Sequence, residues 1–448
     1  MKVVIVGGGF AGLRLARNLN NKPGFEVLLI DRFNYHQFQP LFYQVATAAL
    51  DASNISFPLR KVFHNSKNVR IRVEEVKSVV PQENKIVTAS EEIHYDILVL
   101  ANGADTNFFG NQQMATHAFP MKSTVEALQL RHRIIQNFED ALLLDDPEEI
   151  QRLMNIVIVG GGPTGVEVAG AIAEMRRYVL PKDYPELDFS KMNIYVIEGS
   201  ERTLNNMSEA SAEDSCYYLE KLGVTTIKKT IVKEYDGKNA YLSDRRAIAT
   251  NTVIWAAGIK GNVPEGIDKS LIVRGNRIKV DRQNRVLGLQ NVYALGDVAA
   301  METPLYPNGH PQVASVAIQQ ADVLSHNLRE MAMGSSKVHD FEYRDKGSMA
   351  TIGRNKAVVD LPKHKMHFKG LIAWLIWMGL HLFLILGVKN RIMVFINWVY
   401  NYFTYDQSLR LIFKEFYRPR LPIDDSKQKQ INAGQTQTQP QAQPQTAA

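Results

Sequence analysis

Two glycine-rich segments of this chain, Val3–Gly12 (VVIVGGGFAG) and Ile156–Gly165 (IVIVGGGPTG), can each bind the diphosphate of a dinucleotide. Each follows a short β-branched run that indicates a buried strand, and each opens into a segment with helical spacing, which is the context that a G-x-G-x-x-G motif requires. The diphosphate would rest on the helix N-terminus, where free N–H groups and the positive end of the helix dipole face it. Two such motifs in one chain predict two dinucleotides held at once, and the common use of that arrangement is to pass a hydride between them.

The three glycines of each motif have separate tasks. The first allows the tight turn out of the strand, the second lets the backbone approach the pyrophosphate, and the third lets the helix pack close to the strand. In chain order the two sets are Gly7, Gly9 and Gly12, then Gly160, Gly162 and Gly165. For either motif alone, a strand–turn–helix with small residues and no ligand is the alternative interpretation.

An acidic residue at the end of the next strand is the expected partner of the ribose hydroxyls. Asp31 lies nineteen residues after Gly12, close to the usual distance of about 20 residues. In the second unit the corresponding residue is Glu198, thirty-three residues after Gly165, so we expect an inserted helix and loop around residues 176–191. A carboxylate at Glu198 would repel a 2′-phosphate and favour NADH over NADPH, although Arg202 nearby weakens that preference.

Two further strands end in small residues that let the backbone approach a ligand. The segment His94–Ala104 ends in Asn102 and Gly103, and Thr252–Asn262 contains a turn at Gly258. We expect the first to border a flavin and the second a nicotinamide nucleotide. The implied order is a flavin half, an inserted nicotinamide half, and a return to the flavin half.

The strand Asn291–Ala299 ends in Gly296 and Asp297. Asp297 could accept a hydrogen bond from a hydroxyl of a flavin ribityl chain, while the N-terminus of the following helix faces the diphosphate. A plain helix N-cap is the alternative role for this aspartate.

Bulk composition excludes several classes. The chain has 448 residues and one cysteine, Cys216, so it can hold neither a disulfide framework nor the intramolecular cysteine pair that disulfide reductases and sulfide-oxidising flavoproteins use. A net charge of +6 suits an anionic membrane surface, and no lysine run with interleaved aromatic residues indicates nucleic-acid binding. We expect no cleavable signal peptide before Val3–Val6, and a disordered tail over Ser426–Ala448.

The C-terminal third contains an apolar run, Gly370–Val388, in which His381 is the only strongly polar side chain. By length this run could span a bilayer. The following segment argues for a helix lying in the interface, because its polar residues repeat with helical spacing at Asn397, Asn401, Thr404 and Ser408. Three tryptophans favour helices that lie at the membrane–water interface over an ordinary core helix, namely Trp374, Trp377 and Trp398.

Together these features make the chain resemble a type II NADH:quinone oxidoreductase, the single-subunit respiratory NADH dehydrogenase that pumps no protons. The resemblance runs from Lys2 to about Arg420 and rests on the paired motifs and on the segments Phe33–Asp51, ANGADTNFFG, VIWAAG, ALGD and Tyr343–Arg354. It implies an α/β fold of two Rossmann-like, glutathione-reductase-like domains with FAD in the first and NADH in the second. We expect an FAD domain at 1–118 and 270–345, an inserted NADH domain at 119–269, a membrane-association region at 346–420 with amphipathic helices, and a disordered tail at 421–448.

The resemblance also implies site residues. Glu167 occupies the place of a functionally important glutamate near the nicotinamide–flavin contact, whereas the helix dipole alone would also favour a carboxylate there. The family helix under the flavin carries A-Q-x-A-x-Q-Q, and here Ser315 replaces the first glutamine, so Gln319 is the expected quinone contact. Lys346 could stabilise negative charge on the reduced flavin or quinone, although a solvated loop lysine is nearly as good an interpretation. The histidines show no metal-ligand spacing.

The sequence therefore predicts an FAD enzyme that oxidises NADH and reduces a membrane quinone, menaquinone or ubiquinone. We expect a homodimer lying on the cytoplasmic face of the inner membrane, and the missing transit segment indicates a bacterial membrane. Two alternatives stay open: an oxidoreductase that passes electrons to a soluble acceptor, and a flavoprotein that binds NADH as a redox sensor without catalysis.

Overall fold

The computed structural model describes residues 1–361 and 366–413. The tail expected at 421–448 and the end of the region expected at 346–420 lie outside these residues. The first parallel sheet has the order β22-β9-β1-β2-β5. Its strands are β1 (Lys2–Val6), β2 (Glu26–Asp31), β5 (Val69–Val73), β9 (Ile97–Leu100) and β22 (Val292–Ala294). The first glycine motif leaves the central strand, β1.

Alternate residues of β1 face two different layers. Val3 and Ile5 pack with helices α1 (Phe10–Leu19) and α10 (Ala314–Ala332), and Val4 and Val6 pack with two small sheets on the opposite face. Those sheets contain β6 (Ser78–Val80), β7 (Lys85–Val87) and β8 (Glu92–His94), and β20 (Ile272–Val273), β21 (Arg277–Val280) and β23 (Ala299–Met301). The short strands β3 (Tyr35–Gln37) and β4 (Ser56–Pro58) pair beside them, followed by α3 (Leu59–Val62).

A second parallel sheet repeats the plan with the order β11-β18-β12-β13-β14. Its strands are β11 (Phe119–Pro120), β12 (Ile156–Val159), β13 (Ile194–Ile197), β14 (Thr225–Ile227) and β18 (Thr252–Trp255). Ile156 and Ile158 pack under α5 (Thr124–Ala141) and α7 (Pro163–Tyr178), while Val157 and Val159 face the other layer. That layer includes β15 (Val232–Tyr235), β16 (Asn239–Leu242) and β17 (Ala247–Ala249), with α4 (Gln112–His117) beside β15. Helices α6 (Pro147–Met154), α8 (Leu180–Asp183) and α9 (Glu209–Lys221) complete this part.

The connections between the sheets confirm the expected insertion of one fold into the other. The chain leaves the first sheet through β10 (Ala104–Thr106) and returns through β19 (Ile259–Gly261), and these two strands pair antiparallel. Every strand of the second sheet comes from between them, and β22 rejoins the first sheet afterwards.

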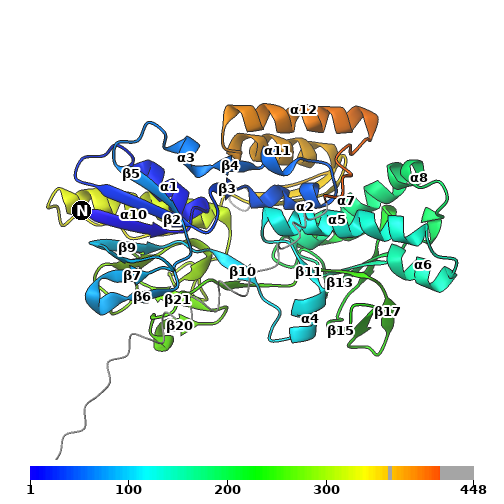
Figure 1. Ribbon diagram of the computed structural model, residues 1–448, viewed down its shortest axis with the longest axis horizontal. Coiled ribbons are helices and arrows are strands. Elements are labelled where there is room, and N and C mark those ends of the chain that lie inside the picture. Colours follow the sequence, from blue (N-terminus) through cyan, green and yellow to red (C-terminus); the bar gives the residue numbers. More distant parts are fainter. Residues whose placement is uncertain (362–365, 414–448) are drawn as a thin grey trace, which may run out of the picture. The chain divides into compact units, whose positions relative to one another are not determined.

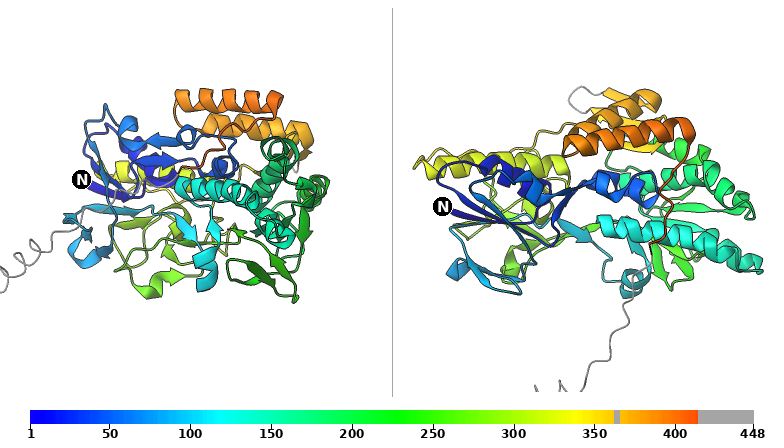
Figure 2. Two further views of the ribbon diagram at one scale, coloured as in Figure 1. Left: turned by 45° about the vertical axis from the view of Figure 1, so that its right-hand side comes forward. Right: turned by 45° about the horizontal axis from the view of Figure 1, so that its top comes forward.

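The C-terminal segment forms a three-stranded sheet and two helices. Strands β24 (Ser348–Gly353), β25 (Lys356–Leu361) and β26 (Met366–Lys369) precede α11 (Gly370–Leu384) and α12 (Val388–Thr404). The two helices run next to each other over α2 (Phe42–Ala46), α5 and α7 (Figure 1, Figure 2). A Cβ added at Gly170 of α7 would overlap the carbonyl oxygen of Ile352, so a glycine allows α7 and β24 to pack closely.

The structure changes the interpretation of the apolar run in two ways. α11 has 15 residues and ends at Leu384, because the chain turns at Gly387 with φ +85° before α12 begins. Within residues 1–361 and 366–413, no helix has the length and apolar character needed to cross a membrane. Trp377 and Trp398 are buried against each other and do not lie at an exposed interface, so the argument from their position was wrong.

The expected polar stripe of α12 is also only partly an outer face. Asn401 donates a hydrogen bond to the Ala49 carbonyl, and the Trp398 indole donates one to Gln44, so both residues face the protein. Ser408 follows the end of the helix at Thr404. These polar groups satisfy backbone and side-chain partners in α2 and the loop after it.

Candidate functional site

The two glycine motifs have nearly the same local geometry. Gly7 and Gly160 adopt φ +106° and +107°, conformations that favour glycine, and a Cβ at either would clash with the neighbouring strand's end. A Cβ at Gly12 or Gly165 would overlap the carbonyl oxygen of the first glycine of its own motif. The first and third glycines thus have the steric roles expected of them.

The middle glycines leave open space in front of two helices. Gly9 and Gly162 are the N-cap residues of α1 and α7, and a Cβ added at either would meet no atom within 4 Å. Neither cap residue offers a side-chain hydrogen bond to the helix, so backbone N–H groups of the first turn are available. This is the room and the donor set that a diphosphate requires.

Asp31 and Glu198 occupy equivalent positions in spite of their different sequence spacing. The Asp31 carboxylate accepts hydrogen bonds from the amides of Gly8 at 2.5 Å and Phe33 at 2.7 Å. The Glu198 carboxylate accepts them from Gly161 at 2.5 Å and Ser200 at 2.7 Å. Burial raises the pKa of Asp31, and the two amides partly offset that effect. The extra residues before Glu198 form the end of the longer helix α7, then α8 and a 3₁₀ turn at Phe189–Lys191.

A cavity lies between the two motifs, and we call it the cofactor cavity; the centres of water-sized spheres can occupy about 370 Å³ of it. Gly9 and Phe10 contribute from the first motif, and Pro163, Thr164 and Glu167 from the second. Gly103, Gly296 and Asp297 also line it. Residues that are far apart in sequence therefore border one space that is large enough for two aromatic ring systems.

Asp297 reaches this cavity through a different local structure from the one expected. Gly296–Val298 form a 3₁₀ turn that leads into β23, so no α-helix follows directly and the helix-dipole part of the prediction was wrong. Gly296 has φ +69°, and its amide donates to the side chain of Gln320 at 2.7 Å. Burial raises the pKa of Asp297, while Lys122 and Arg277 lower it. A buried carboxylate near two cations suits the recognition of hydroxyl groups.

Gly258 lies beside the Phe109 ring, whose Cζ atom would be 2.8 Å from an added Cβ. Its carbonyl accepts a hydrogen bond from the Asn107 amide at 3.0 Å. Gly258 is therefore part of the connection between the two sheets, and it does not line the cofactor cavity.

Glu167 lines the cofactor cavity from the first turn of α7. Its Oε1 accepts a hydrogen bond of 3.4 Å from the backbone amide of Thr351, which belongs to β24. Burial raises the pKa of Glu167 to about 8, against smaller lowering effects of the Thr351 amide and the Trp377 indole. The carboxyl group is therefore mostly protonated at pH 7 and can donate a proton.

The structure does not bring Gln319 and Lys346 to the cofactor cavity. The Gln319 side chain donates a hydrogen bond to the Arg344 carbonyl and accepts one from the Arg344 amide, at 3.1 Å each. Lys346 is exposed in an irregular segment. Ser315, which replaces the family's glutamine, shares a hydrogen bond of 2.8 Å with the Tyr343 hydroxyl. α10 begins at Ala314, and its period turns Gln319 toward the segment 341–347 and away from the cavity.

Five other polar residues line the cavity: Gln39, Tyr43, Lys122, Gln312 and His381. Burial lowers the pKa of His381 to about 4, so its ring is neutral at pH 7. His381 Nδ1 lies 2.7 Å from the Trp377 carbonyl and must carry the proton there, which leaves Nε2 as an acceptor. Gln312 donates to the Asp297 carbonyl at 2.8 Å. The sequence signals for these residues were the family-like segment Phe33–Asp51, which contains Gln39 and Tyr43, and the lone histidine in the apolar run.

A second, smaller cavity lies between α2, α7, β24 and the two C-terminal helices, and we call it the aromatic cavity. Its walls include Trp374, Trp377, Trp398, Tyr402 and Tyr405. It shares two lining residues with the cofactor cavity, Glu167 and Tyr43. No group of three or more residues suited to a metal ion occurs in residues 1–361 and 366–413.

Known proteins share these features over nearly the whole chain. Residues 1–321 match the model of the pyridine nucleotide-disulphide oxidoreductase family, and residues 346–405 match an NDH2 C-terminal domain. A curated relative from Mycobacterium tuberculosis, the type II NADH:quinone oxidoreductase Ndh, is 34% identical over 89% of this chain and 87% of its own length. The type II NADH:quinone oxidoreductase of Staphylococcus aureus is 27% identical over 80% and 89%.

Two solved structures show the same fold. The structure of NDH2 from Plasmodium falciparum in complex with NADH superimposes with a TM-score of 0.84 at 21% identity, covering 92% of this chain and 99% of that one. The sulfide:quinone oxidoreductase of Aquifex aeolicus gives a TM-score of 0.70 at 18% identity, covering 90% and 95%. The single cysteine of this chain, Cys216, cannot form the intramolecular cysteine pair expected of a sulfide-oxidising enzyme.

Proposed function

We propose, from the premise that this chain belongs to the type II NADH:quinone oxidoreductases, that the first motif binds FAD and the second binds NADH so that their rings meet in the cofactor cavity. The chain is an FAD-dependent enzyme that oxidises NADH and reduces a quinone. When bound, the flavin accepts the hydride of NADH and passes two electrons to the quinone. The observation that carries the assignment of the rings is that one cavity borders both glycine motifs.

The binding roles follow from the groups around that cavity. The open N-termini of α1 and α7 suit the two diphosphates. Asp31 and Glu198 suit hydrogen bonds from the ribose hydroxyls. Asp297 suits a ribityl hydroxyl, with Lys122 and Arg277 as neighbouring cations. Gln312 and His381 line the cavity, and we propose that they contact the quinone in place of Gln319 and Lys346.

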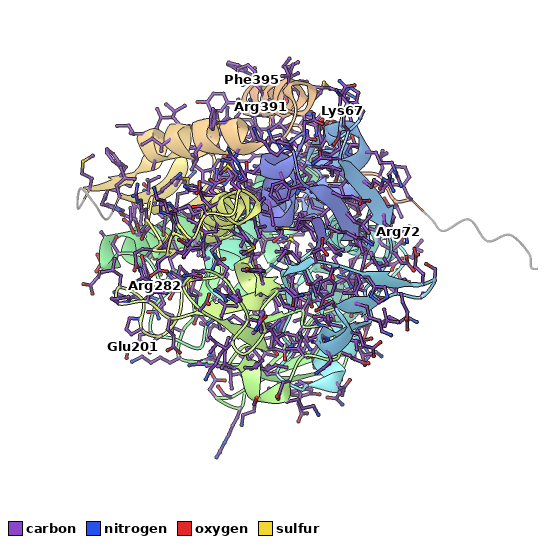
Figure 3. All side chains as sticks on the ribbon, turned by 90° about the vertical axis from the view of Figure 1, so that its left-hand side faces the viewer. Lys67, Arg72, Glu201, Arg282, Arg391 and Phe395 are labelled. Atoms are coloured by element: carbon purple, nitrogen blue, oxygen red, sulfur yellow. The ribbon has the colours of Figure 1, made fainter. Side chains whose placement is uncertain are left out.

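We further propose that α11 and α12 lie on an anionic bilayer at the cytoplasmic face of the membrane. A row of large apolar side chains is exposed on these helices, including Phe383 at 72%, Phe395 at 48% and Phe403 at 76%. Figure 3 shows Phe395 at the outer edge of α12, with Arg391 and Lys67 toward the same edge. An exposed apolar row rimmed by cations is typical of an interfacial helix pair. The homodimer that the resemblance implies is a separate proposal, which sedimentation in detergent tests.

Anaerobic stopped-flow spectroscopy of the purified yellow protein tests the catalytic assignment. NADH should bleach the flavin within the dead time or soon after it, and a short-chain quinone should restore the colour at a rate that supports turnover. Slow reoxidation by quinone with fast reoxidation by oxygen would favour the soluble-acceptor reading. Slow reoxidation by both acceptors would favour a redox sensor.

Co-sedimentation with vesicles tests the membrane proposal. The wild type should bind phosphatidylglycerol vesicles more than phosphatidylcholine vesicles, and the combined change Phe383→Ser, Phe395→Ser and Phe403→Ser should abolish binding. Leu143→Ser is the matched control, because Leu143 is 83% exposed between α5 and α6, away from the C-terminal helices. Equal binding by the triple variant would refute the proposed surface.

A further inference from the structure

The proposed function requires a proton from solvent in every turnover. The balanced reaction is NADH + H⁺ + quinone → NAD⁺ + quinol, so the hydride supplies one hydrogen and its electron pair, and the second hydrogen arrives as a proton. A site that excludes water needs a side chain to hold and deliver that proton. If the proposed function holds, this proton needs a route from solvent to the reacting groups, and the surroundings of Glu167 offer one.

Glu167 stands at the boundary between the cofactor cavity and the aromatic cavity. Its carboxyl group accepts a hydrogen bond from the Thr351 amide of β24 and lies near the Trp377 indole of α11. When cofactors and quinone fill the space on one side of this carboxyl, the other side is the free route by which it can regain its proton. The aromatic cavity is the space on that side.

Glu174 lies seven residues after Glu167 on the same helix, and it lines the aromatic cavity. Two helical turns separate the residues by about 10 Å along the axis and keep them on one face of α7. The Glu174 carboxyl accepts a hydrogen bond from the Arg354 amide at 2.6 Å. Burial raises the pKa of Glu174, opposed by that amide and by the charges of Lys356 and Arg354. Glu174 can therefore exchange protons closer to neutral pH than an ordinary surface glutamate does.

The aromatic cavity has both the room and the polar groups that water needs. The centres of water molecules can occupy about 130 Å³ of it, whereas a single water needs about 10–15 Å³ on the same measure. Polar side chains line it, among them Gln44, Glu174 and Asn401, and they can hydrogen-bond to water there. The Arg354 guanidinium is held 3.9 Å from the ring centres of both Tyr402 and Tyr405, which fixes this wall.

We propose that Glu174 and water in the aromatic cavity resupply the proton that Glu167 delivers to the quinone. In the delivery step the O–H bond of Glu167 breaks and an O–H bond forms on the quinone oxygen, with the electron pair supplied by NADH. The Glu167 carboxylate then takes a proton through water from Glu174, and Glu174 takes one from solvent. Glu174 thus acts through Glu167 and touches neither cofactor nor substrate.

The Glu174→Gln variant separates proton supply from electron transfer. Glutamine has the same shape and keeps an oxygen to accept the Arg354 amide, but it cannot release a carboxyl proton. NADH oxidation is measured with menadione, which takes up protons, and with ferricyanide, which takes electrons only. We expect the ratio of the menadione rate to the ferricyanide rate to fall by about tenfold or more. A group that transfers a proton directly contributes about 10²–10⁴-fold, and Glu174 acts one step further away. Glu174→Asp should restore most of the ratio, and Glu220→Gln on the exposed side of α9 should leave it unchanged.

An unchanged ratio in Glu174→Gln would overturn the proposal, and so would an equal fall of both rates, which indicates a structural role. The proposed function fails differently, because a wild type that reduces ferricyanide and not menadione would contradict quinone reduction itself.

Infrared spectroscopy gives a second readout that needs neither NADH nor quinone. The C=O band of the protonated Glu167 carboxyl, identified by its loss in Glu167→Gln, shifts when the oxidised protein is transferred into D₂O. We expect Glu174→Gln to retain this band and to slow its shift by about tenfold, in line with the same proton-transfer role. An unaltered exchange rate would show that protons reach Glu167 by another path and would refute the relay.

Discussion

The raised pKa of Glu167 predicts a pH-dependent stability difference between the wild type and Glu167→Gln. Folding raises this pKa from 4.5 to about 8. Below pH 4.5 the carboxyl is protonated in both the folded and the unfolded chain, so it costs no stability. As the pH rises above 4.5, the unfolded chain gains stability by ionising while the folded chain stays protonated. The wild type therefore loses stability until the pH passes about 8, where the folded group ionises too.

The size of this loss follows from the two pKa values. Each pH unit between them is worth about 1.4 kcal/mol, so the cost is below about 1 kcal/mol at pH 5 and approaches about 4 kcal/mol at pH 8. Glutamine has no proton to exchange and avoids the cost at every pH. For a chain of this length 1 kcal/mol shifts the melting temperature by roughly 1 °C, so Glu167→Gln should gain about 3–4 °C on the wild type between pH 5 and pH 8.

Differential scanning calorimetry of the flavin-loaded protein at pH 5, 6, 7 and 8 measures this difference at one scan rate. Glu220→Gln, which removes an exposed carboxylate from α9, is the control and should follow the wild type at every pH. A constant difference between Glu167→Gln and the wild type would show that Glu167 ionises normally in the folded protein. That result would remove the basis for treating its carboxyl as a proton donor. Bound flavin in both proteins, seen in the visible spectrum, is required for the comparison.

Two further predictions concern other parts of the chain. Glu198→Gln removes the negative charge beside the proposed ribose site. Steady-state kinetics should show that kcat/KM for NADPH, relative to that for NADH, rises about tenfold, which is equivalent to ~1.4 kcal/mol of lost repulsion. An unchanged ratio would place the ribose elsewhere. Burial alone would lower the pKa of His367, but its hydrogen bonds to Asp214 at 3.0 Å and Asp360 at 2.9 Å outweigh that effect and raise it. The charged ring therefore stabilises the contact of α9 with β25 and β26 fully below pH 6.5, and less as the pH rises through the raised pKa. The loss of melting temperature caused by His367→Gln should be largest near pH 6 and should shrink by pH 9. A difference that does not depend on pH would refute the charge pair.

Local geometry explains which parts of the site could be predicted from the sequence. Gly7, Gly160, Asp31 and Glu198 belong to strand–turn–helix units whose parts lie close together in the chain, so residue type and spacing suffice to place them. Even the irregular spacing of Glu198 did not hide it, because the end of a neighbouring parallel strand fixes its position. The insertion of one fold into the other followed from the order of these units.

The opposite holds for residues whose positions depend on distant segments. Gln319 and Gln320 are neighbours on α10, yet Gln320 bonds to the Gly296 amide while Gln319 bonds to Arg344, and only the packing of α10 against two separate segments decides which faces the site. The tryptophans of α11 and α12 were expected at an interface because they are amphipathic, but α2 offers Trp398 a buried partner in Gln44. Composition cannot distinguish a tryptophan that anchors a helix to lipid from one that anchors it to the protein.

Helix α7 links the two halves of the proposed chemistry. Its N-terminus forms the second dinucleotide motif, and its first turn brings Glu167 to the cofactor cavity. Gly170 then allows β24 to approach so closely that backbone amides of β24 and the turn after it reach Glu167 and Glu174. Because these amides come from the C-terminal region, that region positions both carboxyl groups as well as carrying the exposed apolar helices. A single rigid helix can in this way couple nucleotide binding at one end to proton supply along its side.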